Sequence, residues 1–223
     1  LKDLGKLQEA ELSYRKAIEI KPDYAEAHTN MGGILNNIGK LKDAELFTRK
    51  AIELKPEHAD SHSNLGLILK DLGNLQESEI SAQKSIELNP NNPQSHLNLG
   101  SILKDLGRYQ EAFASYLKAS KISPKSSNIY VLITRFLRDS EPSKLNQIEL
   151  LKILNLLLEK NEISHKELFK AFNFLYCNKI KDNIKTIDSD HLKIESFGRD
   201  KLLVNALKKI IFTEILNCYE NLY

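Results

Sequence analysis

The sequence predicts an all-α fold in which helical hairpins stack side by side into an α-solenoid. Three series of residues that commonly end or bend helices recur every 34 positions, which is a period typical of helical repeats. The prolines are Pro22, Pro56, Pro90 and Pro124, the first glycines are Gly5, Gly39, Gly73 and Gly107, and the second glycines are Gly32, Gly66 and Gly100. Such a unit buries its apolar face only by packing against its neighbours.

Each unit is expected to contain two helices, because apolar residues recur at helical spacing on both sides of the turn glycine. In the unit 25–58 the first helix should run over about 25–38, and Gly39 with Lys40 should form the turn. The second helix should run over about 41–54 and end before Pro56. A glycine just past a helix end is favoured because the left-handed backbone conformation costs it little.

The second glycine series predicts close contact between the two helices of a unit. A glycine inside a helix costs about 1 kcal/mol relative to alanine, so a compensating contact is expected there. Small side chains recur on the second helix, where they allow it to approach the first. They are Ala10, Ala44, Ser78 and Ala112, and then Ala17, Ala51, Ser85 and Ala119.

These residues resemble the tetratricopeptide repeat (TPR) family, with its Leu-Gly pair (Met31-Gly32, Leu65-Gly66 and Leu99-Gly100), small residues and terminal proline. The resemblance covers full repeats 25–58, 59–92 and 93–126 and a partial repeat 1–24, and it implies a right-handed superhelix. Histidines replace the family's large aromatic residue at His28, His62 and His96. With the asparagine two residues later, they make the repeats most similar to those of protein O-GlcNAc transferases and bacterial TPR proteins.

The composition changes near residue 126, after which alanine and glycine become scarce. We expect residues 127–138 to form a divergent capping helix, because terminal repeats need an atypical outer face. The region 139–223 should be helical, with helices at about 143–160 and from Ser164, where Ser164 and Glu167 form a capping box. Residues 179–198 resemble a linker, and 201–223 an amphipathic helix that caps the chain or docks elsewhere. The region also fits a connector to a further domain, and the incomplete first repeat predicts sequence before Leu1.

The candidate site is a concave groove lined by the first helix of each repeat. Residues four, seven and eleven positions apart share a helix face. The resulting candidates are Glu26, Asn30 and Asn37, then Asp60, Asn64 and Asp71, and then Gln94, Asn98 and Asp105. An asparagine amide both donates and accepts hydrogen bonds, so it can pair with any peptide backbone. The resemblance to O-GlcNAc transferases implies such a ladder at Asn30, Asn64 and Asn98, and the acidic residues would favour Lys or Arg in the ligand. Alternatively, the asparagines satisfy neighbouring groups or face solvent.

Other kinds of site are disfavoured by composition and spacing. A net charge of +2 argues against nucleic acid as a partner. Two cysteines, Cys177 and Cys218, cannot form a disulfide framework, so a cytoplasmic location is expected. The sequence has no run of 18 apolar residues suited to a membrane span. The repeat histidines stand too far apart to share a metal ion, and Cys177 with His165 lacks the accompanying motifs of a catalytic pair. The Lys-Asp-Leu-Gly turns that end at Gly5, Gly73 and Gly107 do not have the pattern of phosphate-binding loops. We therefore expect no metal or cofactor.

Two function classes follow. The first is a scaffold or adaptor without enzymatic activity that binds an extended segment of another protein in the groove. The second is the substrate-recruiting region of a larger enzyme, a glycosyltransferase of the O-GlcNAc transferase type or a methyltransferase that uses S-adenosylmethionine. In that case the catalytic domain would lie after Tyr223.

Overall fold

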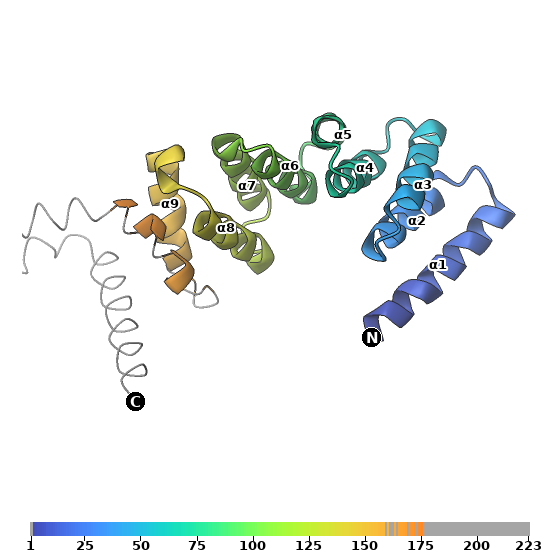
Figure 1. Cartoon of the computed structure of the whole chain (residues 1–223), viewed down its shortest axis with the longest axis horizontal. Coiled ribbons are helices and arrows are strands. Elements are labelled where there is room, and N and C mark those ends of the chain that lie inside the picture. Colours follow the sequence, from blue (N-terminus) through green and yellow to red (C-terminus); the bar gives the residue numbers. More distant parts are fainter. Residues whose placement is uncertain are drawn as a thin grey trace, which may run out of the picture. The chain divides into compact units, whose positions relative to one another are not determined.

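The computed structural model describes residues 2–158, 160, 163, 165–168, 170–172 and 174–175 (Figure 1). Every regular element of these residues is a helix, as the periodicity predicts. The chain divides into an N-terminal unit, Leu1–Pro124, and a C-terminal unit, Lys125–Tyr223. Predictions for Ser164, for Cys177 and Cys218, and for residues 179–198 and 201–223 lie outside the described residues.

The N-terminal unit consists of α1 followed by three helical hairpins. The helices are α1 (Lys2–Ile20), α2 (Ala25–Asn37), α3 (Leu41–Leu54), α4 (Ala59–Asp71), α5 (Leu75–Leu88), α6 (Pro93–Asp105) and α7 (Tyr109–Ile122). Each hairpin packs against the next through α3 with α4 and α5 with α6, and α4 also contacts α2 and α6. The first helices of the repeats are therefore neighbours of one another.

The hairpin turns have the predicted glycine conformation. Gly39, Gly73 and Gly107 have φ values of 84°, 85° and 76°, which other residues rarely adopt. In the first of these turns the backbone N–H of Lys40 donates to the carbonyl of Leu35 at 2.9 Å, which satisfies a carbonyl at the end of α2. The turn expected at Gly5 is wrong, because α1 runs through it.

The glycines within the first helices lie where the second helix approaches most closely. A Cβ added at Gly32 would lie 2.0 Å from Thr48 Oγ1, and one added at Gly100 would lie 2.9 Å from the Tyr116 ring. The small residues of the second helices are fully buried at Ala44, Ala51, Ser78, Ser85, Ala112 and Ala119. Both observations confirm the close packing that the sequence predicts.

The three repeat histidines fasten the start of each first helix to the loop before it. The Nε2–H of His28 donates to the carbonyl of Pro22 at 2.8 Å, and His62 and His96 make the same bond to Pro56 at 2.8 Å and Pro90 at 2.9 Å. A carbonyl only accepts, so the proton lies on Nε2 of each ring. The histidine and the proline six residues earlier thus form one structural device in each repeat.

The C-terminal unit contains α8 (Ser127–Asp139), the short 3-10 helix η1 (Pro142–Lys144), α9 (Gln147–Leu158) and the 3-10 helix η2 (His165–Leu168). Its described core combines aliphatic residues, which include Ile133, Leu137, Leu150, Leu154, Leu157 and Leu168, with the aromatic residues Tyr130, Phe136 and Phe172, all almost fully buried. The expected start of α9 near Ser143 is wrong. Leu145 is extended, and the Asn146 side chain accepts hydrogen bonds from the backbone N–H groups of Ile148 and Glu149, both at 3.1 Å, so the helix begins at Gln147.

Candidate peptide-binding groove

An open cavity of about 560 Å³ lies along the first helices of the three repeats. It is lined by Glu26, Thr29 and Asn30 of α2, by Asp60, Ser63, Asn64 and Leu67 of α4, by Gln94 and Asn98 of α6, and by the preceding residues His58 and Asn92. The lining residues include none from α3, α5 or α7. We call this cavity the first-helix groove. Six of the nine residues predicted from the sequence meet here: Glu26, Asn30, Asp60, Asn64, Gln94 and Asn98.

The other three predicted residues do not line the first-helix groove. Asn37, Asp71 and Asp105 are the last residues of α2, α4 and α6. The Nζ of Lys70 lies 3.4 Å from the carboxylate of Asp71 and 3.8 Å from that of Asp105. One lysine therefore already neutralises part of the negative charge that was expected to attract a basic ligand.

Two of the asparagines link successive repeats. The Nδ2 of Asn64 donates to the Thr29 carbonyl at 3.3 Å, and the Nδ2 of Asn98 donates to the Ser63 hydroxyl at 2.8 Å. The Oδ1 of Asn98 also accepts from the Gln94 amide at 2.8 Å, and Asn98 is only 4% exposed. At Asn98 the alternative interpretation, an amide that satisfies its neighbours, therefore describes the geometry well.

Asn30 and Asn64 retain hydrogen-bonding capacity toward the groove. Asn30 is exposed, and its side chain makes no hydrogen bond to any residue that the structure describes. Asn64 is half-buried and uses one amide proton toward Thr29, so its oxygen and second proton remain for another partner. These two amides are the members of the predicted ladder best placed to meet a ligand.

The acidic residues of the groove differ in their pairing. The Lys55 Nζ lies 2.8 Å from Glu26 Oε1, and this hydrogen bond holds the pKa of Glu26 below its usual value. Asp60 is exposed and forms no ion pair within the described part of the chain. Asp60 is therefore the groove carboxylate that can bind a basic group without displacing an existing partner.

A chain of hydrogen bonds at the edge of the groove includes a histidine that the sequence analysis did not single out. The Thr29 hydroxyl donates to the Ala25 carbonyl at 3.0 Å and lies 2.6 Å from Ser61 Oγ, which lies 2.7 Å from His58 Nδ1. Because each hydroxyl has one proton, Ser61 donates to Thr29 and the Nδ1–H of His58 donates to Ser61. The equivalent residues are Tyr24, Asn92 and Ser126, so no repeat pattern identifies His58.

The groove presents neutral amides, hydroxyls and carboxylates, with Leu67 as its one large aliphatic side chain. In the described ranges no cluster of three or more His, Cys, Asp or Glu side chains could hold a metal ion. Among the same residues, no helix has both the length and the apolar character needed to cross a bilayer. Such a lining is suited to hydrogen bonding and ion pairing with a ligand.

Family models match the chain over its repeats. A model described as TPR repeat matches residues 1–39, and models described as tetratricopeptide repeat match 25–58, 59–92 and 81–114. Two of these ranges coincide with the repeats predicted from the sequence. The chain belongs to the tetratricopeptide repeat family.

Solved structures share the fold. A crystal structure of MamA has a TM-score of 0.53 at 19% identity, over 81% of this chain and 91% of that chain. The structure titled functional characterization of Pseudomonas aeruginosa pilF has a TM-score of 0.63 at 18% identity, over 88% of this chain and 91% of that chain. At these identities the likeness concerns the fold alone. No curated protein matches the sequence.

Proposed function

We propose that this chain binds an extended segment of a partner protein in the first-helix groove. Membership of the TPR family supports a protein-interaction scaffold. The observation that best supports this binding mode is a pair of amides that line the same cavity. The Asn30 amide is exposed in one repeat, and the Asn64 amide in the next repeat uses only part of its hydrogen-bonding capacity.

The spacing of the repeats suits main-chain recognition. Packed helices lie about 8–10 Å apart, whereas an extended peptide advances about 3.3 Å per residue. Amides at equivalent positions of successive repeats would therefore meet main-chain groups about three residues apart in the ligand. Because an amide pairs with a carbonyl or an N–H of any residue, this contact would set the ligand's direction and register rather than its sequence.

A preference for a basic ligand would come mainly from Asp60. Its carboxylate is exposed and unpaired within the described residues, whereas Glu26 is held by Lys55, and Asp71 and Asp105 share Lys70. An exposed ion pair contributes about 0.2–1 kcal/mol, so Lys or Arg at one ligand position should strengthen binding by a few-fold.

Peptides selected from a displayed random library, used as the probe, test this proposal. Asn30→Ala and Asn64→Ala should each weaken the selected peptides by about 0.5–1.5 kcal/mol, or roughly two- to tenfold in Kd, measured by calorimetric titration. Asn91→Ala is the control, because Asn91 is exposed and does not line the groove. Unchanged affinity in both groove variants would contradict the proposed binding mode.

The second function class, a substrate-recruiting region of a larger enzyme, stays a prediction. The first-helix groove would then hold the protein substrate of a glycosyltransferase or methyltransferase domain elsewhere in the polypeptide. The complete gene sequence distinguishes the two classes, because such a domain after Tyr223 would favour the enzyme. Neither class assigns a catalytic role to the groove residues.

A further inference from the structure

The second helices carry an apolar row on the surface that lies outside the first-helix groove. Leu12 on α1, Leu46 on α3 and Ile80 on α5 stand at equivalent positions of three successive repeats, with exposures of 62%, 69% and 66%. One exposed aliphatic residue is ordinary in a soluble protein. The same exposed residue in three consecutive repeats forms a stripe, which exposes considerably more apolar area.

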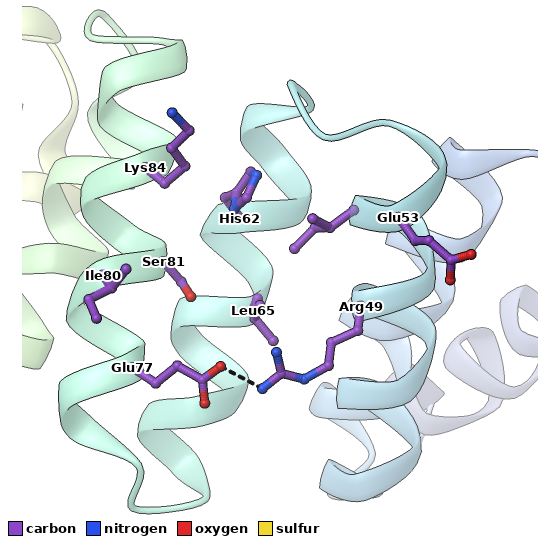
Figure 2. Close-up of a pocket in the computed structure, with 9 residues that line it drawn as sticks. Arg49, Glu53, His62, Leu65, Glu77, Ile80, Ser81 and Lys84 are labelled. Carbon is purple, nitrogen blue, oxygen red and sulfur yellow. Dashed lines mark hydrogen bonds and ion pairs between the residues drawn. The ribbon is translucent and has the colours of Figure 1, made fainter.

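A second cavity, of about 500 Å³, opens beside this row (Figure 2). Its apolar lining comes from Ile52, Leu65 and Ile80. Figure 2 shows Leu65 of α4 between the side chains of α3 and those of α5, with the 2.7 Å ion pair from Arg49 to Glu77 crossing one end. Arg49 lies three positions after Leu46, so the row and the cavity share one face of α3. This face therefore combines protruding aliphatic side chains with a hollow that could receive one.

The charges around the row repeat in a fixed order. In α1, α3 and α5 an acidic residue lies three positions before the exposed aliphatic residue, and a lysine lies four positions after it. The sets are Glu9, Leu12 and Lys16, then Asp43, Leu46 and Lys50, then Glu77, Ile80 and Lys84. When two such helices pack antiparallel, each acid faces a lysine and the aliphatic residues face one another. A surface of this kind is complementary to a second copy of itself across a two-fold axis.

We infer that the surface formed by α3 and α5 is the interface of a homodimer. A two-fold axis perpendicular to these helices packs α3 antiparallel to α3 of the other copy and α5 antiparallel to α5, so Leu46 lies opposite Leu46 and Ile80 opposite Ile80. Asp43 then faces Lys50 of the other copy, Glu77 faces Lys84, and the two-fold axis repeats each contact. The exposed pairs within each copy, Lys50 with Glu53 at 2.9 Å and Lys84 with Glu87 at 3.0 Å, contribute little and leave the lysines able to pair again.

This arrangement leaves the first-helix groove of each copy open, because α3 and α5 contribute no residue to it. A dimer would thus present two grooves to its partners. Two linked sites bind a partner with repeated segments more tightly than either site alone.

Sedimentation velocity of the full chain over a range of concentrations tests the interface. The wild type should dimerise, and Leu46→Glu and Ile80→Glu should each make it monomeric while circular dichroism shows an unchanged helical fold. Ile148→Glu is the matched control, because Ile148 is 67% exposed and lies on α9 in the other unit. A wild type that stays monomeric, or a Leu46→Glu variant that still dimerises, would overturn the inference.

Charge reversal tests the pairing itself. Asp43→Lys should weaken the affinity of the dimer by about tenfold, because the new lysine faces Lys50 of the other copy at two symmetry-related points. Adding Lys50→Glu to that variant should restore the affinity, since the two reversed charges again face opposite charges. If the second change weakens the dimer further, α3 does not face its own counterpart. If the chain is monomeric and a helix from a different protein binds this face, the interface belongs to that partner and the inference fails.

Discussion

Single side chains in the first helices serve either the fold or the ligand, and their burial distinguishes the two. Asn98 is 4% exposed and is hydrogen-bonded to Ser63 and Gln94, so its amide holds α4 and α6 together. Asn30 occupies the equivalent position but is exposed, with no such bond in the described chain. The same residue type therefore has different consequences in different repeats.

Asn98→Ala should accordingly destabilise the protein far more than Asn30→Ala. The first variant leaves the buried Ser63 hydroxyl without its donor and should lower the free energy of unfolding by about 1–3 kcal/mol. The second should change it by less than about 0.5 kcal/mol, as surface substitutions usually do. Urea unfolding followed by circular dichroism measures both, and equal losses would refute the distinction.

At the scale of elements, contact between the two helices of a hairpin depends on glycine. Gly32 faces Thr48 of α3, whose hydroxyl is buried and donates to the Ala44 carbonyl at 2.8 Å. Gly33, its neighbour in the sequence, faces α4 instead, and an added Cβ would lie 3.4 Å from the Asn64 amide nitrogen. Two adjacent glycines in one helix are thus under different constraints.

Gly32→Ala should lower the free energy of unfolding by about 1–3 kcal/mol, because the new methyl group overlaps Thr48 in a packed interface. Adding Thr48→Ala should recover part of that loss, so the double variant should be more stable than the sum of the single effects. Gly33→Ala is the control and should be neutral or gain up to about 1 kcal/mol from helix propensity. Additive losses in the double variant would show that Thr48 is not the obstacle.

At the scale of the whole molecule, exposed ion pairs connect each repeat to the next. Lys40 lies 3.5 Å from Glu11, Arg49 lies 2.7 Å from Glu77, and Arg108 lies 2.7 Å from Glu79. Lys55 and Glu26, 2.8 Å apart, form a further pair within one repeat. Hydrogen bonding to Arg15 and to Lys55 lowers the pKa of Glu11 and of Glu26, respectively. A lowered folded-state pKa means that the contribution to stability is present at neutral pH and is lost as the pH falls through that value.

Thermal stability should therefore fall below about pH 4.5, the ordinary value for these carboxyl groups. The loss should be smaller in a Lys55→Ala variant, in which Glu26 has no cation to lose. Melting temperatures followed from about pH 6 to pH 3 measure the effect, and added salt should reduce it because exposed pairs are screened. An identical acid profile in the variant would exclude Glu26 as a contributor.

The sequence was sufficient to predict the hairpins because their causes are local and repeated. Gly39 and Pro56 set the helix ends by backbone conformation alone, and Gly32 marks a close contact by its helix-propensity cost. The start of α9 at Gln147 was missed because the cap formed by Asn146 was not recognised.

Less of the groove could be predicted from the sequence, because the ion pairs and hydrogen bonds of its residues depend on contacts between repeats. Helical spacing placed six of the nine candidates together, but it did not reveal that Lys70 lies between Asp71 and Asp105. Burial separates Asn98 from Asn30 although the two have the same position in their repeats. His58 has no counterpart in the other repeats, so repetition does not point to its local contact with Ser61, and only the folded chain brings Ser61 to Thr29.

We propose that a bound peptide lies along α2, α4 and α6. A selected peptide that carries a photoreactive residue, cross-linked to the full chain and mapped by mass spectrometry, tests this directly. Cross-links are expected at groove residues of these three helices, such as Asn30, Asn64 and Leu67, and they should disappear when unlabelled peptide competes. Competable cross-links confined to α3, α5 and α7 would contradict this binding mode.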